Sequence, residues 1–360
     1  MTLPTASGAR RVGVQPLASF AADALTAAGL PGAQAATVAQ AMVEADLTGA
    51  DAHGILRLPQ YVAALRRGDI NPRPQLQLHG SGPSTAIVDG DNGMGHVVMA
   101  AAVAAAIERA RQTGIAWVGT RRSNHAGAGG VYAAMPAHAG MVGVYSAVSG
   151  LNHMAASGGA TPLLGTNPLA IALPARDGAP VVIDIAMSVV SSGVVRAHAL
   201  TGQPMPAGWM TDRVSGEPLH DAKDAAKGLI EPIGGYKGAG LALVLGLLAG
   251  TLNGAAFGAD LPDFATPDSG FGVNTGQFIL ALDVARFMPL DAFMQAVERH
   301  LHELEASPRL PGSDAIRWPG RERERRRAER LAHGVALPAE LWSQLDGLAT
   351  QLGVAALASR

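Results

Sequence analysis

A histidine and an arginine stand four residues apart in the segment from Asp51 to Tyr61, which reads DAHGILRLPQY. On a helix, His53, Arg57 and Tyr61 would share one face. An arginine can bind a carboxylate through two parallel hydrogen bonds, and a histidine can donate or accept a proton near neutral pH. The pair suggests a site that holds an acid and moves a proton. The alternative is a polar helix face that Pro59 bends.

A second group of polar residues lies in a glycine-rich turn. The segment SNHAGAGG, residues 123–130, contains Asn124 and His125 and follows a predicted strand. Glycines let the backbone approach a ligand closely, and the amides at the start of a helix attract anions. The two interpretations are a turn that contacts a ligand and a turn that merely contains a histidine.

An acidic residue lies at the end of an apolar strand. Asp184 occurs in VVIDIAMS, residues 181–188, and the segment GTNP at 165–168 opens the strand before it. An acid in an apolar setting is costly unless it has a partner. A histidine is one such partner, because a carboxylate can orient the ring and stabilise its protonated form. Alternatively, Asp184 or Ser188 caps the next helix.

Two other segments concentrate positive charge. Lys237 lies in GGYKGAG, residues 234–240, where amides and a cation at a helix start could bind an anion. The alternative is a glycine-rich loop with a solvated lysine. Residues 321–330 hold six Arg and three Glu. Because Glu322 and Arg326 are four apart, as are Arg325 and Glu329, a salt-bridged surface helix is favoured over a nucleic-acid site.

The composition excludes several classes of protein. Of the 360 residues, 48% are hydrophobic, 16% are charged and none is Cys, and the net charge is −2. Disorder, disulfide scaffolds, cysteine-bound metal centres and thiol enzymes are therefore excluded. A pI near 6.6 gives no general attraction to nucleic acid or anionic membranes. The longest apolar run, 238–252, is shorter than the ~18–20 residues that cross a bilayer. Without an export signal, the cytoplasm is the expected location.

Hydrophobic periodicity predicts helical ends around a mixed centre. Helices are predicted at 15–30, 33–47, 51–67, 290–305, 321–331 and 338–352. The centre is predicted to hold strands at 85–88, 115–118, 141–145, 168–173, 181–185 and 278–282, and helices at 96–111, 130–139 and 238–252. The prediction is a discontinuous helical domain, 1–75 plus 308–360, around a central α/β domain, 76–307.

The usual nucleotide-binding signatures are absent. Gly93 to Gly95 and Gly127 to Gly129 each begin a Gly-x-Gly-x-x-Gly pattern, but neither has the third glycine at the required position. There is also no Walker A loop, no His-Glu-x-x-His and no Gly-x-Ser-x-Gly. If this chain binds a nucleotide cofactor, it does so with a different architecture.

Taken together and in order, the motifs resemble the malate/L-lactate dehydrogenase family of the non-Rossmann type. Its relatives include ureidoglycolate and sulfolactate dehydrogenases, 2,3-diketo-L-gulonate reductase and piperideine-2-carboxylate reductase. The similarity runs from about residue 15 to 355. It is carried by DAHGILRLPQY, SNHAGAGGVY, LLGTNPLAIALP, GGYKGAGLAL and AIRWPGRE.

The resemblance implies a fold and an activity. The fold would be mixed α/β and non-Rossmann, with a helical domain from both termini and a central, largely antiparallel sheet that binds the nucleotide. The activity would be NAD- or NADP-dependent, reversible hydride transfer between nicotinamide and a 2-hydroxy or 2-oxo acid. The partners would be a small carboxylate substrate and a second subunit, in a homodimer with active sites near the interface. The alternatives are a cyclic imino-acid reductase and a cofactor-binding homologue without activity.

The resemblance also assigns roles to residues. His53 would donate the proton to the carbonyl oxygen, although in some members the histidine at His125 is the acid/base. Asp184 would orient the catalytic histidine, and no metal is expected. The substrate would be bound by Arg57, Asn124 and Thr166. The cofactor would be contacted by His125, Ile183, Asp184, Ile185, Ala186, Met187, Ser188, Lys237, Gly320, Arg321 and Glu322.

The chain departs from the family pattern near the expected site. Ala52 replaces the family's serine before the histidine, and Val148 replaces an asparagine. Residues 150–160 also differ from the usual pattern. These changes are compatible with an altered substrate, a weaker enzyme or a lost activity. An altered substrate is favoured, because His53 and Arg57 remain.

Overall fold

The computed structural model describes residues 9–80, 82–176, 179–262 and 271–360. Its centre is a seven-stranded sheet with the strand order β2-β3-β4-β10-β5-β6-β7. Residues 1–8 of the predicted helical domain lie outside the described residues. The sheet strands are β2 (Gln77–His79), β3 (Thr85–Asp89), β4 (Ile115–Ser123), β10 (Thr275–Asp283), β5 (Met141–Ala147), β6 (Leu169–Leu173) and β7 (Val181–Ile185).

The sheet is mixed, and nearly all of its neighbouring strands are antiparallel. Only β3 and β4 run parallel among the paired strands of the described sheet. Strand β10 lies at its middle and pairs with both β4 and β5, which precede it by more than a hundred residues. A doubly wound nucleotide-binding sheet is mostly parallel. The missing glycine fingerprint therefore agrees with the sheet that forms.

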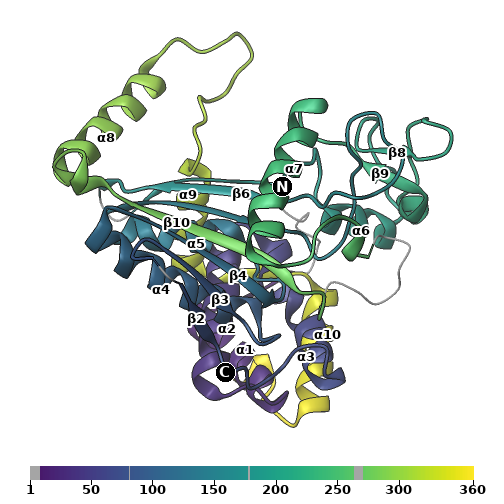
Figure 1. The fold of residues 1–360 in the computed structure, drawn as a ribbon. Helices are drawn as coiled ribbons and strands as arrows, with labels where there is room; N and C mark the ends of the chain where they lie inside the picture. The colour runs from purple at the N-terminus through teal and green to yellow at the C-terminus, as the bar shows by residue number, and fades with distance from the viewer. Residues whose placement is uncertain (1–8, 81, 177–178, 263–270) are drawn as a thin grey trace.

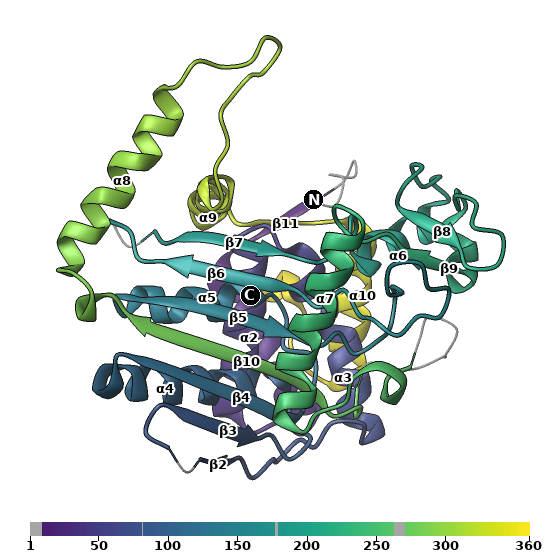
Figure 2. The same ribbon diagram turned by 45° about the horizontal axis from the view of Figure 1, so that its top comes forward.

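Helices cover the two faces of the sheet unequally. Helices α4 (Gly95–Thr113) and α5 (Gly129–His138) pack along one face, and their apolar residues form one core with the strands. On the other face, α7 (Tyr236–Ala249) crosses only one end of the strands (Figures 1 and 2). Helix α8 (Leu290–Ala306) stands away from the sheet at the opposite end and has no buried residue. Much of this second face is therefore uncovered.

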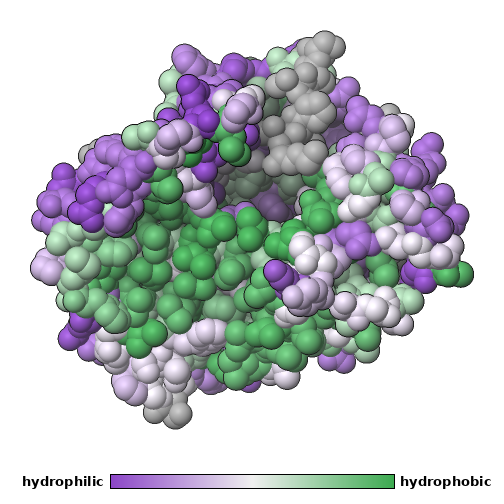
Figure 3. Space-filling view, turned by 90° about the horizontal axis from the view of Figure 1, so that it is seen from above, coloured by the Kyte–Doolittle hydropathy of each residue, from purple (hydrophilic) through white to green (hydrophobic). Residues whose placement is uncertain are grey.

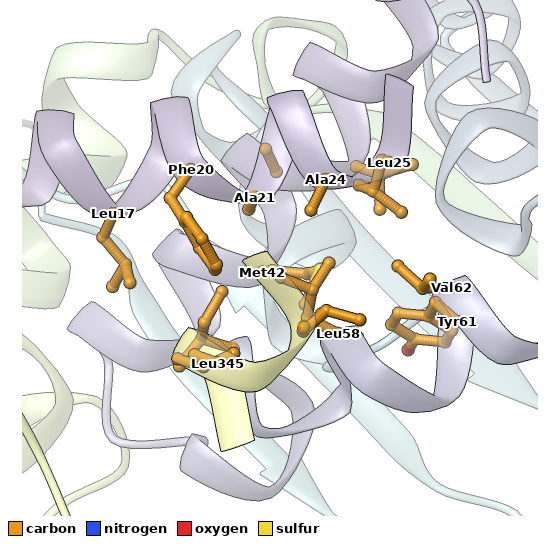
Figure 4. Packing of buried hydrophobic residues seen from close by; sticks show 14 of the residues in the cluster. Leu17, Phe20, Ala21, Ala24, Leu25, Met42, Leu58, Tyr61, Val62 and Leu345 are labelled. Atoms are coloured by element: carbon orange, nitrogen blue, oxygen red, sulfur yellow. The ribbon is translucent and has the colours of Figure 1, made fainter. Parts of the chain in front are cut away.

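Both ends of the chain contribute to one apolar cluster. It joins α1 (Val14–Ala27), α2 (Gly32–Leu47) and α3 (Leu58–Arg67) to α10 (Ala339–Leu352). Leu17, Phe20 and Leu25 of α1 recur at helical spacing and meet Met42 and Leu345 in this cluster (Figure 4). A short ladder between β1 (Arg10–Val12) and β11 (Val335–Leu337) ties the two ends together.

The remaining elements surround the cavity described below. They are α6 (Ser192–Thr201), β8 (Met210–Asp212), β9 (Gly228–Ile230) and α9 (Arg321–His333). Neither α6 nor the three-residue strands β1, β2, β8, β9 and β11 was predicted, because so few residues carry no clear hydrophobic period. No helix within the described ranges combines the length and apolarity needed to span a membrane.

The predicted continuous helix at 51–67 is wrong. Residues Asp51–His53 and Ile55–Arg57 form separate 3₁₀ turns, and the α-helix begins only at Leu58. Gly54 separates the turns with φ −90° and ψ −144°. A Cβ on this glycine would lie 1.8 Å from a carboxylate oxygen of Asp46, so the backbone passes directly over that buried side chain.

Two glycines provide a matched test of the packing. A Cβ at Gly143 in β5 would lie 2.1 Å from the carbonyl oxygen of Ala133 in α5, whereas one at Gly347 in α10 would meet nothing within 4 Å. We expect Gly143→Ala to lower the free energy of unfolding by about 1–3 kcal/mol through overpacking. Gly347→Ala should raise it by about 0.5–1 kcal/mol, because alanine is the better helix former. Denaturant unfolding measures both; equal effects would contradict the packing of α5 on β5.

Candidate active site

A cavity of about 1050 Å³ lies where the helical cluster, the end of the sheet and α6 meet. Its walls come from several separate parts of the chain. They are residues 48–67, 125–129, 145–153 and 166–196, each in part, together with Ile233, Phe271, Thr275, Gln277 and Arg323. Pockets of about 300–1000 Å³ hold drug-sized ligands. This cavity is therefore large enough for a small acid together with part of a larger cofactor.

His53 and Arg57 both line the cavity, although they do not share a regular helix. The Arg57 guanidinium donates from Nε to the carbonyl oxygen of Ala52 at 3.0 Å and from a terminal nitrogen to Gln60 Oε1 at 2.8 Å. It has no carboxylate partner among the described residues. A neutral carbonyl and amide fix its direction but leave its charge uncompensated, as an anion-binding arginine requires.

A buried network holds the 51–57 segment in place. Asp46 on α2 accepts a hydrogen bond from the Ile55 amide at 2.8 Å. Arg330 on α9 donates to the Asp46 carbonyl oxygen and pairs with Asp51. Burial raises the pKa of the Asp46 carboxyl, while the Ile55 amide and Arg330 act against that rise. Elements from both ends of the chain therefore fix the position of His53.

His125 reaches the same cavity from the glycine-rich turn before α5. Its ring stacks against that of His53, with centroids 5.4 Å apart and an interplanar angle of 18°. The Tyr61 hydroxyl lies 2.7 Å from His125 Nδ1. Because Tyr61 is itself packed in the helical cluster (Figure 4), it ties that cluster to the second histidine. Gly127 turns the chain here with φ +82°.

Asp184 lies at the end of β7 and lines the cavity. It is surrounded by protein on its other sides, and it is exposed to the solvent that fills the cavity. Its Oδ2 accepts a hydrogen bond from the Gly130 amide at 2.7 Å. Burial raises the pKa of the Asp184 carboxyl, and the Gly130 bond and Arg323 oppose the rise. Among the described contacts none joins Asp184 to a histidine, so its predicted orienting role stays a prediction.

Burial keeps the histidines of the site uncharged. It lowers the pKa of His53 to about 4, and the positive charge of Arg57 adds to the effect. Burial, then Arg57 and the neighbouring rings, lower the pKa of His125 well below 6.5. His96 packs edge-on against Tyr61 with both ring nitrogens unpartnered, and burial lowers its pKa to about 3. The site is therefore a neutral imidazole cluster beside a fixed positive charge.

The structure brings together part of the predicted set. Besides the histidines and Arg57, the cavity wall includes Thr166, Asp184, Ile185, Ala186 and Ser188. The other predicted residues do not line the cavity. Asn124 is fully buried and bonded to the 92–93 backbone, Met187 lies in an apolar core, and Lys237 is exposed at the start of α7. Ile183 is in β7, and Gly320, Arg321 and Glu322 begin α9 close to that strand. Their roles stay predictions.

Three arginines of the cavity, Arg67, Arg196 and Arg323, were not singled out from the sequence. Arg196 is on the unpredicted helix α6, so no pattern could have indicated it. Arg323 lies within the Arg-rich helix, whose two predicted salt bridges form, Glu322 to Arg326 at 2.8 Å and Arg325 to Glu329 at 3.9 Å. Arg323 points inward and lines the cavity, which the surface-helix interpretation did not anticipate. No group of metal-binding side chains occurs in the described part of the chain.

The site therefore combines an arginine without a carboxylate partner and neutral histidines in one cavity, on a sheet that is not doubly wound. Comparison with known proteins identifies the family. A sequence model described as malate/L-lactate dehydrogenase matches residues 12–346, and the chain belongs to this family. As a member, it is an oxidoreductase that acts on hydroxy acids.

Individual relatives match nearly the whole chain. Malate dehydrogenase of Pyrococcus abyssi is 34% identical, covering 96% of this chain and 96% of its own length. Delta(1)-pyrroline-2-carboxylate reductase of Pseudomonas fluorescens is 32% identical over 90% of this chain and 94% of its own. The structure of sulfolactate dehydrogenase from Methanocaldococcus jannaschii superimposes with a TM-score of 0.87 at 32% identity, covering 97% of this chain and 99% of that one.

The neutral histidines predict a loss of stability in acid. The pKa values are about 4 for His53 and about 3 for His96 and His153, against 6.5 for an ordinary histidine. Between these values the unfolded chain binds more protons than the native chain. The free energy of unfolding therefore falls as the pH drops below about 6.5, by about 1.4 kcal/mol per pH unit for each histidine.

The variant His96→Gln tests this prediction. It should reduce the slope of unfolding free energy against pH, between about pH 4 and 6, by about 1.4 kcal/mol per unit. Urea unfolding at several pH values measures the slope. His79→Gln on the exposed strand β2 is the control and should leave the slope unchanged. An unchanged slope in His96→Gln would mean that His96 is not held neutral.

Proposed function

We propose that this protein is an NAD- or NADP-dependent 2-hydroxy-acid dehydrogenase working reversibly on a malate- or lactate-like acid. One observation carries the proposal: Arg57, without an acidic partner, lies beside His53 in the cavity. An arginine can hold the substrate carboxylate, and the neighbouring histidine then exchanges a proton with the adjacent oxygen. Membership of the dehydrogenase family supplies the reaction class.

The family implies a nicotinamide cofactor, which when bound supplies or accepts the hydride. In reduction, His53 would donate a proton to the carbonyl oxygen of a 2-oxo acid as the carbonyl carbon accepts the hydride and its two electrons. The products are the 2-hydroxy acid and oxidised nicotinamide. In oxidation, neutral His53 takes the hydroxyl proton. The cavity has room for the nicotinamide beside the substrate, because a small acid occupies only part of its volume of about 1050 Å³.

Substrate binding and proton transfer are linked through Arg57. Its charge helps to lower the pKa of His53. A substrate carboxylate on Arg57 would offset that charge and so raise the pKa of His53. Binding an acid therefore favours the protonated histidine that reduction needs. His125, held by Tyr61 and stacked on His53, would line the substrate site and is the second candidate for the acid/base role.

We also propose which residues contact the cofactor and how the chain divides into domains. The wall formed by Asp184 to Ser188 would hold the nicotinamide end. Lys237 and the segment from Gly320 to Glu322 would contact the rest of the dinucleotide outside the cavity. Residues 1–75 and 308–360 would form a helical domain, supported by the shared apolar cluster, and residues 76–307 the cofactor domain. The expected location is the cytoplasm.

A cyclic imino-acid reductase is the second candidate. The similarity to a pyrroline-2-carboxylate reductase favours it, since that protein shares most of its length with this chain. An imino acid also carries a carboxylate next to the carbon that accepts hydride. Arg57 would then still bind the carboxylate, and the carbon that accepts the hydride would be double-bonded to nitrogen in place of oxygen. A homologue that binds cofactor without turnover would show binding of NADH and no reaction with either class.

A homodimer is the third part of the proposal, and the uncovered sheet face supports it. Figure 3 shows a broad apolar region on the face seen from above. Side chains of α7 form part of this exposed surface, namely Leu241, Leu243, Val244 and Leu247. Ile185 and Val189 are also exposed and line the cavity. Monomers rarely expose large contiguous apolar patches, so a second copy would cover this face and lie near the active site.

Turnover of 2-hydroxy acids tests the function. We expect the purified protein to oxidise malate, lactate or sulfolactate with NAD or NADP, followed by absorbance of the reduced nicotinamide. Arg57→Ala should reduce kcat/KM about 100-fold or more, chiefly by raising KM, because the carboxylate loses a charged hydrogen-bond partner. Failure to bind either cofactor would contradict the proposal.

Two histidine variants assign the acid/base. His53→Ala should lower kcat at least about 100-fold, since general acid–base catalysis contributes that much. His125→Ala tests the alternative in the same assay. An undiminished kcat in His53→Ala, with a loss in His125→Ala, would transfer the role to His125. Reduction of pyrroline- or piperideine-2-carboxylate, without oxidation of any hydroxy acid, would favour the imino-acid function.

A single charge on the apolar face tests the dimer. Val244 on α7 is 52% exposed and Val214 is 92% exposed. Val244→Lys should convert the dimer into monomer by burying an unpaired charge at the interface, as measured by analytical ultracentrifugation. Val214→Lys, outside the apolar face, is the control and should remain dimeric. A dimer unaffected by Val244→Lys would place the interface elsewhere.

A further inference from the structure

The charges around the cavity do not balance. Its wall carries four arginines and two aspartates, with no Lys or Glu. Arg67 is paired with Asp69 at 2.7 Å. Asp51 is paired with Arg330, and Asp184 faces Arg323. Two arginines, Arg57 and Arg196, are left without a carboxylate among the described residues.

The two unpaired arginines belong to the same part of the cavity. Arg57 donates to the carbonyl oxygen of Ala52. The Cβ of Ala52 lies 3.5 Å from where a Cβ on Gly193 would stand, so the first turn of α6 packs directly against it. Arg196 is three residues after Gly193 and therefore on the same side of that helix. Arg57, Arg196 and His153 all line the cavity.

Their electrostatic coupling agrees with this placement. Burial lowers the pKa of Arg196, and Arg57 lowers it further. Burial lowers the pKa of His153 to about 3, and Arg196 and then Arg57 contribute in the same direction. Two like charges that influence each other raise the free energy of the empty site. A ligand with two negative charges relieves both at once.

We propose that Arg196 forms a second anion subsite, so that the preferred substrate is a 2-hydroxy or 2-oxo acid with a second acidic group at its far end. Arg57 binds the carboxylate next to the reacting carbon, and Arg196 binds the distal carboxylate or sulfonate. This inference rests on the proposed function and names its substrate class. A monocarboxylate such as lactate leaves Arg196 unpaired and is used less well.

A cofactor phosphate is the competing ligand for Arg196. The substrate interpretation is favoured because Arg196 shares its surroundings with Arg57 and His153. Of the residues predicted to contact the dinucleotide, Lys237 and Gly320 to Glu322 do not line this cavity. Asp184 to Ala186 and Ser188 do line it, and they are proposed to hold the nicotinamide end of the cofactor. The two interpretations predict different changes in the same variant. Loss of a substrate subsite changes the choice between acids, whereas loss of a phosphate contact weakens NADH or NADPH binding for every acid.

The test compares L-malate with L-lactate in wild type and in Arg196→Gln. A charged hydrogen bond contributes about 1.5–3 kcal/mol, so kcat/KM for malate should fall about 10- to 100-fold. The value for lactate should change less than about threefold, and Arg196→Lys should recover part of the malate activity. Arg66→Gln is the control, because Arg66 is exposed on α3 and does not line the cavity. Equal losses for both acids would overturn the subsite.

Binding measurements separate this inference from the proposed function. Calorimetry gives the affinity of wild type and Arg196→Gln for malate, lactate and each reduced cofactor. If neither acid turns over but malate still binds through Arg196, the function fails and the anion subsite stands. If the variant loses affinity for the cofactor and keeps its preference for malate over lactate, Arg196 binds a phosphate and the subsite is rejected.

Discussion

The hydrogen bond from the Ile55 amide to the Asp46 carboxylate is the contact on which the site depends. It holds an irregular segment that no regular secondary structure supports, and that segment carries His53 and Arg57. A hydrogen bond to a buried charged group contributes about 1.5–3 kcal/mol, and an unpaired buried carboxylate would cost more. Arg330 completes the arrangement from α9. The geometry of the site therefore requires helices from both ends of the chain.

The same architecture explains why the histidines of the site are neutral. The cavity lies where the helical cluster meets the sheet, so its histidines are enclosed on several sides. Enclosure removes the hydration that stabilises an imidazolium ion, and Arg57 opposes that charge as well. A negatively charged substrate would supply the negative charge that the empty site lacks beside Arg57. In the proposed mechanism, electrostatics alone would couple substrate binding to proton transfer.

The single chain leaves much of one face of the sheet uncovered. Helices α4 and α5 cover one face, while α7 covers one end of the other. The apolar side chains of α7 and of the cavity rim are exposed as a result. A second copy on this face would both bury them and close the site from outside. The proposed dimer interface and the candidate active site would then lie on neighbouring surfaces.

Local pattern was enough to predict the regular elements whose one face is buried. The strand at 181–185 was predicted with its observed bounds, and the helices at 33–47 and 338–352 nearly so, because buried residues repeat at a fixed spacing along those helices. The family was also recognisable, since its motifs are contiguous. The break at Gly54 was not predictable, because its cause is Asp46, eight residues away on another helix.

The sequence by itself determined the family, the central elements and the residues His53, Arg57 and His125 as candidates. Only the tertiary structure decided which of the candidates meet. It placed Thr166 and Asp184 on the cavity wall. The Asn124 side chain instead donates a hydrogen bond to the carbonyl oxygen of Gly93, and Lys237 is exposed at the surface. The tertiary structure also brought Arg196 to the same cavity as Arg57, although they are far apart in the chain. Periodicity along the sequence indicates whether a residue is buried. The residues that it contacts depend on how whole helices and strands pack together, and no local pattern encodes that packing.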